Sequence, residues 1–291
     1  MYKPELYIHT GRATHFLRWE IKEFKRHFRL VEKPNESTAL LCFGPDVLRE
    51  ASRLPALKRF AVLFPGFGHN PLYNDELLPS QLKIIEQKYE HIFINKGPLQ
   101  IAYKDLKPNK VSMYPFSIDI LLLGKCTPRV ALENILHLSN DAPQKDWPRS
   151  ERIMKKTGML YEVYPPRDGV THEYITHEKV IEKYKEYDSF VHVAKDINSK
   201  VHIDGKYTAS FIEAGATGAI LFWHDTFGLG NDLKTVFELP LDEAAAADRI
   251  NEIRKNLNVK RHSKRTMREM RRMFNPRKSV TIRARKIKSL L

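Results

Sequence analysis

Residues 210–222 read SFIEAGATGAILF, and they contain the clearest fold signal in the chain. The first part has the composition of a short helix with one acid, Glu213. Gly218 follows where that helix should end, a position that favours a left-handed backbone conformation and therefore glycine. An apolar strand starts directly afterwards, at Ala219. A helix that ends in glycine and leads into a buried strand is typical of α/β proteins with a parallel sheet.

The same alternation extends in both directions. In the first half we expect strands at 6–10, 39–44, 59–65, 91–95 and 111–115. The clearest helix is 16–30, where apolar residues recur with helical spacing at Leu17, Ile21, Phe24 and Phe28. In the second half we expect strands at 135–139, 160–164, 189–194 and 219–223, with helices at 150–156, 179–187, 207–215 and 241–257. Strands that alternate with helices predict parallel sheets covered on both faces.

The pattern restarts after residues 124–129, which contain Thr127-Pro128 and are typical of a linker. We therefore expect two Rossmann-like domains, 1–126 and 127–258, which is an ordinary division for 291 residues. In such sheets a ligand binds where the carboxyl ends of the strands meet helix N-termini. Residues 259–291 are expected to form a basic helical tail.

The formal net charge of +14 is concentrated in that tail. Residues 259–291 hold 13 Lys and Arg with the single acid Glu269, a charge of +12, against +6 for 1–126 and −4 for 127–258. Such a segment indicates an anionic partner, either nucleic acid or an acidic membrane surface. A solvated helix face with additional lysines is the alternative.

Several classes of protein are excluded by composition. The hydrophobic content of 42% argues against wholesale disorder, and no run approaches the roughly 18 apolar residues of a membrane span. The N-terminus MYKPELYIHTGR lacks the pattern of a signal peptide. Cys42 and Cys126 have no metal-ligand or CxxC spacing. We expect a cytoplasmic protein.

Residues 213–218 resemble the nucleotide-sugar motif of the retaining GT-B glycosyltransferases of family 4, a glutamate in an E-A-x-A-x-G helix end before a strand. The matching residues are Glu213, Ala214, Ala216 and Gly218. In that family the glutamate binds the ribose hydroxyls of the donor, which suits a carboxylate that accepts two hydrogen bonds. The resemblance implies a GT-B fold, with two Rossmann-like domains facing each other across a cleft, and a nucleotide-sugar-dependent hexosyltransferase. The alternative is an ordinary helix–glycine–strand junction with a surface glutamate.

The family has a second acid eight positions earlier, near the donor sugar. That position is Gly205 here, so Asp204 takes the role with a shift of one residue, or the second acid is absent. Tyr207 and Thr208 lie where the helix should begin. Free backbone N–H groups and the helix dipole favour a phosphate there.

Residues 137–146, HLSNDAPQKD, resemble the family's G-R-x-x-P-E-K loop, whose Arg and Lys hold the diphosphate. Pro143 and Lys145 match, and a lysine can neutralise the charge of the departing nucleotide. The departures are Ser139 for Gly, Asn140 for Arg and Gln144 for Glu. Arg149 or Arg152 could replace the missing arginine, and a solvated loop lysine is the alternative for Lys145.

The first half carries weaker signals. Gly11 and Arg12 follow a predicted strand, where the family has a glycine loop near donor and acceptor. His69 lies in PGFGHN, 65–70, and resembles the family histidine that faces the sugar. Both segments are also consistent with ordinary turns. Residues 117–119 resemble the family's segment before the hinge.

No Walker loop, GxGxxG, GxSxG or HExxH motif occurs. There is also no Asp-x-Asp, the metal–diphosphate motif of the other large glycosyltransferase fold. We therefore expect no metal and no cofactor, with a UDP-linked sugar as the donor. The resemblance implies retention, with Lys145 and the amides near Thr208 on the diphosphate and Glu213 on the ribose.

The acceptor is the most open question. The short chain and basic tail resemble compact phage or viral glucosyltransferases that modify hydroxymethylated bases in DNA. The expected DNA contacts are Arg268, Arg271, Arg272, Arg277 and Lys278. Two alternatives are an enzyme that builds a cell-surface glycan on a lipid or sugar, and a catalytically inactive GT-B-like nucleic-acid-binding protein. The apolar side of the tail, Met267, Met270 and Phe274, would contact a membrane or pack back on the first domain.

Overall fold

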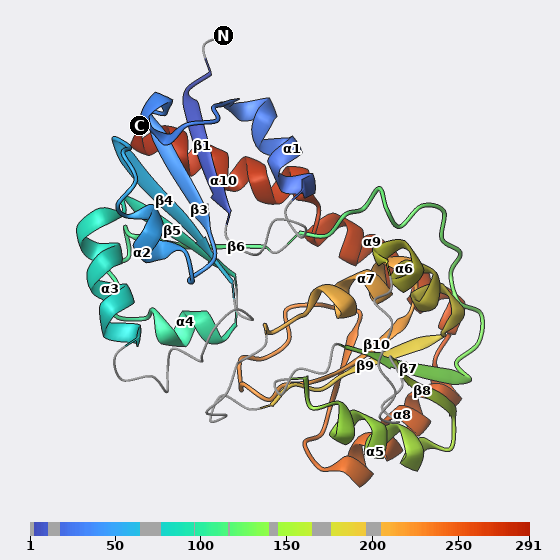
Figure 1. Cartoon of the computed structure of the whole chain (residues 1–291). Helices are drawn as coiled ribbons and strands as arrows, with labels where there is room; N and C mark the ends of the chain where they lie inside the picture. The colour runs from blue at the N-terminus through green and yellow to red at the C-terminus, as the bar shows by residue number, and fades with distance from the viewer. Residues whose placement is uncertain are drawn as a thin grey trace. The chain divides into compact units, whose positions relative to one another are not determined.

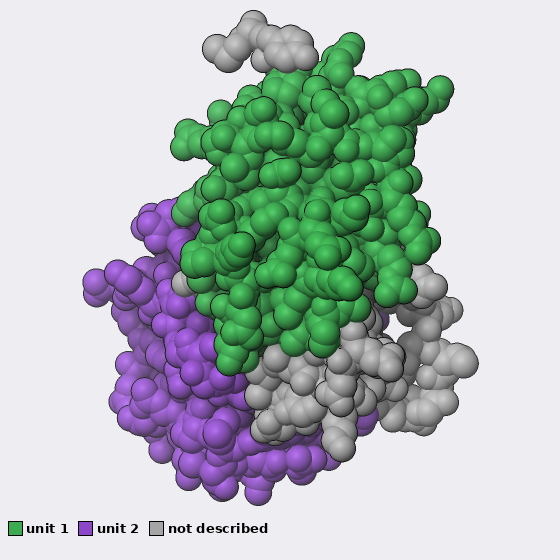
Figure 2. Space-filling view, turned by 90° about the vertical axis from the view of Figure 1, so that its left-hand side faces the viewer, with its two compact units in different colours: residues 1–117, 200–205, 276–291 green, residues 118–199, 206–275 purple. Residues whose placement is uncertain are grey.

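The computed structural model describes residues 3–10, 18–64, 77–95, 97–115, 117–139, 145–164, 176–195 and 205–291. The chain forms two compact units, coloured separately in Figure 2. The first unit comprises 1–117, 200–205 and 276–291, and the second comprises 118–199 and 206–275. The C-terminal segment of the chain therefore belongs to the same unit as its N-terminal half.

The first unit is built on a six-stranded sheet in the order β2-β1-β3-β4-β5-β6. Every neighbouring pair is parallel, with Leu6 opposite Ala39 where β1 meets β3. The central strand β3 is apolar along its whole length, and β4 is apolar from Phe60 on, because both faces of the sheet are covered there. The strands are β1 (Glu5–Thr10), β2 (Arg29–Leu30), β3 (Ala39–Phe43), β4 (Lys58–Leu63), β5 (His91–Asn95) and β6 (Val111–Tyr114).

Helices cover both faces of this sheet (Figure 1). Leu41 of β3 belongs to a core that includes Phe24 of one helix and Ala284 of another. The adjacent Leu40 points to the opposite face, into a second core. The helices are α1 (Arg18–His27), the 3-10 helix η2 (Pro34–Glu36), α2 (Leu48–Ala51), α3 (Leu77–Lys88), α4 (Pro98–Ala102) and α10 (Pro276–Leu290).

The second unit has a five-stranded parallel sheet in the order β11-β10-β9-β7-β8. Helices α5 and α8 pack on each other and contribute to a core with one face of the sheet, while α7 packs against β9, α6 and α9. The strands are β7 (Asn134–Leu138), β8 (Leu160–Tyr164), β9 (Ser189–His192), β10 (Ile220–His224) and β11 (Val236–Leu239). The helices are α5 (Trp147–Thr157), α6 (His177–Glu186), α7 (Ala209–Thr217), α8 (Glu243–Asn256) and α9 (Val259–Met273).

These sheets confirm the α/β class with two Rossmann-like units. Strands β5 and β8 have the predicted bounds, and the other predicted strands agree to within two residues. The pattern missed β2, which has two residues, and β11, which follows a polar loop. Helix α7 begins two residues later than predicted because Thr208 is its N-cap.

The tail divides between the two units. Helix α9 packs on α7 of the second unit, where Met270 is fully buried and Phe274 nearly so. The side chains of Met270 and Met267 lie beside Gly215 and Gly218 at the end of α7, so for these two residues the expected contact with a membrane or the first domain is wrong. Helix α10 does pack on the first unit, beside α1 and β6 (Figure 1). Among the described helices, none is long and apolar enough to cross a membrane.

Candidate donor site in the second unit

The site expected for a donor lies where the chain changes direction across the second sheet. Strand β7 has β8 on one side and β9 on the other, and the connections after β7 and β9 leave in opposite directions. Such a switch point opens a crevice at the carboxyl ends of the two strands. The segment that carries Lys145 follows β7, and helix α7 is the next element after β9. Two of the sequence motifs therefore lie at the carboxyl-terminal edge of the same sheet.

Lys145 lies close to the end of β9. Burial, together with the positive charges of Lys145 and His224, lowers the pKa of His192, the last residue of β9, to about 3. An ammonium group near this strand end can neutralise an anion in the crevice. His192 itself stays uncharged at neutral pH.

The N-terminus of α7 faces the same edge. The Thr208 hydroxyl accepts a hydrogen bond from Phe211 N at 3.3 Å, and its carbonyl accepts one from Ile212 N at 3.1 Å. The amides of Ala209 and Ser210 come before the first N–H that can bond within the helix. A helix start of this kind offers two N–H donors and a favourable dipole to a phosphate.

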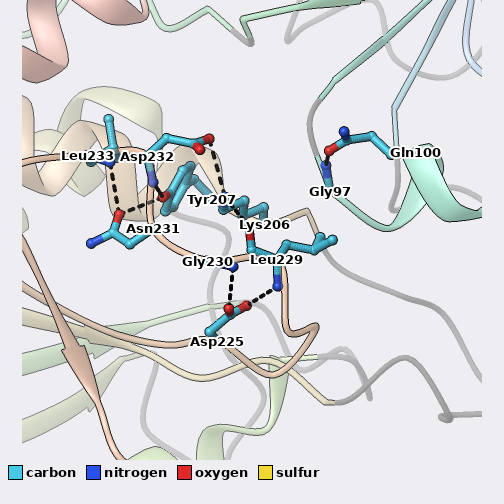
Figure 3. A network of polar contacts seen from close by, with 10 residues as sticks. All are labelled: Gly97, Gln100, Lys206, Tyr207, Asp225, Leu229, Gly230, Asn231, Asp232 and Leu233. Atoms are coloured by element: carbon cyan, nitrogen blue, oxygen red, sulfur yellow. Dashed lines mark hydrogen bonds and ion pairs between the residues drawn. The ribbon is translucent and has the colours of Figure 1, made fainter.

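Tyr207 orders the loop beside this helix start. Its ring stacks on Phe211 at 5.9 Å between centroids, and its hydroxyl donates to Asn231 Oδ1 at 2.8 Å and accepts from Asp232 N at 3.0 Å. The hydroxyl of Tyr207 thus forms both of these hydrogen bonds within the protein (Figure 3). Direct contact between Tyr207 and a donor stays a prediction.

Lys206 is a residue that the sequence reasoning missed. It is only 2% exposed, and its ammonium contacts Asp232 Oδ2 at 3.2 Å and Leu229 O at 3.3 Å (Figure 3). It also lies over the rings of Tyr207 and Trp223, at 5.4 and 5.8 Å. A buried lysine needs such partners. The available signal was a lysine directly after Gly205, the position of the missing family acid.

The loop held by Lys206 has its own supports. Asp225 accepts hydrogen bonds from Leu229 N at 3.0 Å and Gly230 N at 2.5 Å (Figure 3). Gly228 and Gly230 have φ values of 62° and 66°, a conformation that favours glycine. The loop after β10 is therefore fixed to the start of α7.

Glu213 lies inside the unit, on the part of α7 that packs against α6. It is 4% exposed, and its Oε1 accepts a hydrogen bond from His177 Nε2 at 2.8 Å. The hydrogen bond to this carboxylate raises the pKa of His177 above its usual 6.5. Burial raises the pKa of Glu213, an effect that His177 opposes and Asp119 strengthens. The idea of an ordinary surface glutamate is wrong for this residue.

Gly218 ends α7 as predicted. Its φ is 110°, in the left-handed region, and Ser263 of α9 donates to its carbonyl at 2.6 Å. An added Cβ would lie 3.0 Å from Ser263 Oγ and 3.2 Å from Thr127 O. Both the backbone conformation and the close approach of α9 explain the glycine.

No model of a known protein family matches the sequence, and no curated protein matches it either. Solved structures do match. Sucrose-phosphate synthase from Thermosynechococcus elongatus is 11% identical, with 99% of each chain covered and a TM-score of 0.71. HepE from Anabaena, in complex with UDP-glucose, is also 11% identical with a TM-score of 0.71, over 100% of both chains. A glycosyltransferase from Rickettsia africae is 10% identical over 100% of this chain and 99% of its own, with a TM-score of 0.67.

The chain has the GT-B fold. The TM-scores of 0.67 to 0.71 show the shared architecture, and at identities of 10 to 11% they show the fold alone and leave the activity to be argued from the site.

Some predicted site residues lie outside the described part of the structure. These are Gly11, Arg12, His69, Asn140 and Asp204. Their proposed contacts with donor or acceptor therefore stay predictions.

Arg149 and Arg152, the two arginines considered as replacements for the family arginine, contact the segment around the start of α8. Arg149 donates to the carbonyl of Leu241, and Arg152 forms an ion pair with Glu243 at 2.8 Å. Both border a surface cavity of about 570 Å³ between α5 and the start of α8. Among the described residues, no group of three His, Cys, Asp or Glu side chains is placed to hold a metal ion.

The five predicted nucleic-acid contacts are divided by the fold. Arg268, Arg271 and Arg272 are on α9 in the second unit, while Arg277 and Lys278 begin α10 in the first. Arg271 donates to Ala216 O at 3.0 Å and so helps to end α7. The other four are exposed at the surface.

Proposed function

We propose that this chain is a nucleotide-sugar-dependent glycosyltransferase that transfers a hexose from a UDP-linked donor to an acceptor hydroxyl. The proposal is supported by the GT-B fold and by the connections of the second sheet, in which the segment of Lys145 follows β7 and α7, with Glu213, follows β9. HepE, a protein of the same fold, was solved with UDP-glucose, which supports the choice of donor.

The proposed chemistry is stabilisation of the leaving group. The ammonium group of Lys145 and the amides at the start of α7 take the diphosphate, and their positive charge favours breakage of the bond from the sugar to the phosphate oxygen. The Glu213 carboxylate accepts the ribose hydroxyls. Retention follows from the family 4 resemblance, and a departing phosphate oxygen that takes the acceptor proton removes the need for a separate base.

The sugar-side and acceptor-side roles are assigned by resemblance alone. Asp204 would contact the donor sugar, Asn140 would stand in the diphosphate loop, and His69 would hydrogen-bond a sugar hydroxyl. Gly11 and Arg12 would line the approach to donor and acceptor.

The direct test is a binding and transfer assay. Calorimetry with UDP, GDP and ADP measures nucleotide preference, and incubation with UDP-glucose, UDP-GlcNAc and GDP-mannose measures donor hydrolysis or transfer. We expect UDP binding that Glu213→Gln weakens by about tenfold or more, the effect of losing a hydrogen bond to a charged group. No binding of any nucleotide by the wild-type protein would contradict the proposal.

For the acceptor we propose DNA that carries a hydroxymethylated base, and the observation that favours it is a basic stripe on α9. This basic stripe consists of six exposed residues on one helix: Lys260, Arg261, Lys264, Arg265, Arg268 and Arg272. The acid of this helix, Glu269, accepts hydrogen bonds from Thr235 N at 2.9 Å and Lys234 N at 3.1 Å, so it is turned toward the protein. Arginine can bind phosphate through two parallel hydrogen bonds.

The apolar side of α9 bears on the membrane alternative. Because Met270 and Phe274 are buried in the second unit, α9 has no free apolar face to insert into a lipid surface. An anionic membrane would then be held by charge alone. A linear row of arginines along one helix fits a phosphodiester strand better than an extended plane of lipid headgroups.

The acceptor is tested with a variant of the basic stripe and a control variant of the same net charge. Arg261, Arg265, Arg268 and Arg272 are replaced by Gln in one variant. In the control the same change is made at four exposed, dispersed lysines: Lys33, Lys104, Lys107 and Lys125. Gel shifts with hydroxymethylated duplex DNA at two salt concentrations give the slope of log affinity against log salt, about −0.9 for each phosphate neutralised.

We expect the stripe variant to lose several-fold more affinity than the control and to show a shallower slope. Equal losses in both variants, or salt-insensitive binding by the wild type, would reject DNA. Sedimentation with phosphatidylserine vesicles tests the lipid alternative. DNA binding together with no sugar transfer from any donor would favour a catalytically inactive nucleic-acid-binding protein.

A further inference from the structure

His177, whose side chain is partly exposed to solvent, contacts the buried carboxylate of Glu213. Glu213 is 4% exposed, whereas the side chain of His177 is 36% exposed, and their atoms Oε1 and Nε2 lie 2.8 Å apart. His177 is the first residue of α6, directly after the N-cap Thr176, whose hydroxyl accepts from Lys179 N. The imidazole therefore extends from the first turn of α6 to Glu213 in the middle of α7.

A buried glutamate can accept hydrogen bonds from both ribose hydroxyls only in its ionised form. A carboxylate accepts hydrogen bonds on both oxygens, whereas the protonated acid must donate at one of them. Burial favours the protonated acid, because a charge removed from water is costly unless it is paired. The cation that compensates this cost in the described structure is His177.

We propose that His177 is a positioning residue that keeps Glu213 ionised and oriented for the ribose hydroxyls of the donor. The inference rests on the proposed function, since it assumes a nucleotide at this site. His177 would act through Glu213, with one ring nitrogen on Oε1, so that the carboxylate is held at one oxygen and presents the other to the ribose.

The groups around the pair favour a charged imidazole. Asp119 lies near both residues from the segment before β7, and Glu178 adds negative charge from the same helix as His177. Tyr184 of α6 is buried beside Glu213, and its pKa is raised well above its usual range by burial and by that carboxylate. The described charged groups that face His177 are therefore acids, and they raise its pKa.

The raised pKa values of His177 and Glu213 determine how donor affinity should change with pH. The pKa of His177 is raised by the hydrogen bond to Glu213, so the ion pair is lost as pH rises through that raised value. At acid pH, the raised pKa of Glu213 sets the other limit, where the carboxylate becomes protonated. Donor affinity should therefore decline toward both the alkaline and the acid end of the pH range.

The experiment measures the affinity of UDP and of 2′,3′-dideoxy-UDP by calorimetry from about pH 5 to about pH 9, across the range in which histidine titrates. The proteins are the wild type, His177→Gln and His177→Lys, with Lys179→Gln as a control. Lys179 is exposed in the same helical turn, so its replacement removes a cation without touching Glu213. Circular dichroism melts establish that each variant is folded.

We expect His177→Gln to bind UDP about tenfold more weakly at neutral pH and to lose the alkaline decline. His177→Lys should keep much of the affinity and extend it to higher pH, because a lysine stays charged there. The dideoxy nucleotide should bind the wild type and His177→Gln equally, since it lacks the hydroxyls that Glu213 would accept.

Two results would overturn the inference while the proposed function stands. One is UDP binding by His177→Gln with the affinity and pH profile of the wild type. The other is an equal loss for UDP and its dideoxy analogue, which would show a merely structural role. Failure of the wild type to bind any nucleotide would instead reject the proposed function.

Discussion

The guanidinium group of Arg283 lies 2.7 Å from the carboxylate of Glu20 in the interior of the first unit. Arg283 comes from α10 and Glu20 from α1, and both side chains are almost completely buried. The guanidinium also lies over the ring of Tyr114 at 4.4 Å. The Ser117 hydroxyl donates to the same carboxylate. A basic residue of the C-terminal tail thus fixes α10 on the first unit.

This ion pair predicts a large loss of stability when one partner is removed. Glu20→Gln leaves a buried guanidinium without its counter-charge, which costs about 3–5 kcal/mol in the free energy of unfolding. Urea denaturation measures the change. The exposed neighbour Arg285→Gln should change stability by no more than about 0.5 kcal/mol.

The double variant Glu20→Leu/Arg283→Met is the matched control for this pair. Replacing both charges by apolar groups removes the buried cation, so it should be more stable than Glu20→Gln. Equal stability of Glu20→Gln and the wild type would show that the pair does not hold α10 in place.

Lys145→Ala should lower turnover by about a hundredfold or more. A diphosphate whose charge is not neutralised is a poor leaving group, and the loss of one electrostatic donor has effects of this order. Steady-state kinetics with the preferred donor separate this effect on kcat from any change in KM. Lys156→Ala, an exposed lysine of α5, should behave as the wild type. Near wild-type kcat in Lys145→Ala would remove this lysine from the mechanism.

Transfer should proceed without a divalent metal ion. The sequence has no Asp-x-Asp motif, and the proposed diphosphate contacts are a lysine and a helix N-terminus. Activity should survive dialysis against EDTA. Loss of activity in EDTA that Mn²⁺ or Mg²⁺ restores in single-turnover measurements would contradict this prediction, whereas a metal effect on product release alone would not.

Stability should fall in mild acid because of two buried histidines. Burial lowers the pKa of His192 to about 3 and that of His224 to about 4. As pH falls below about 6.5, the unfolded chain binds protons that the folded protein does not, so stability is lost until the pH reaches the folded values. Each histidine should lower the free energy of unfolding by about 2 kcal/mol between pH 7 and pH 5.

The variant His224→Phe tests this assignment. Neither ring nitrogen of His224 has a hydrogen-bond partner among the described residues. Replacement by phenylalanine therefore removes the titrating group without removing a described hydrogen bond. Urea denaturation at pH 7 and at pH 5 should show a smaller difference for the variant than for the wild type. An unchanged difference would mean that His224 does not contribute to the acid sensitivity.

The local sequence was sufficient for the elements themselves. The α/β class and nearly all strands follow from short apolar runs between amphipathic segments, because period and length are properties of adjacent residues. The left-handed end of α7 at Gly218 could also be predicted, since helix termination depends on the backbone freedom of one residue. The concentration of charge after residue 258 is likewise a fact of composition.

The tertiary structure decided which helix and sheet faces contact each other. Glu213 and His177 are 36 positions apart, and no spacing rule links them. Val280, Ala284 and Ile287 have helical spacing, but a dense run of basic residues surrounds them and Arg283 shares their buried side. A sequence pattern shows that a helix has an apolar face. It does not show which sheet covers that face, because this depends on contacts between residues far apart in the chain.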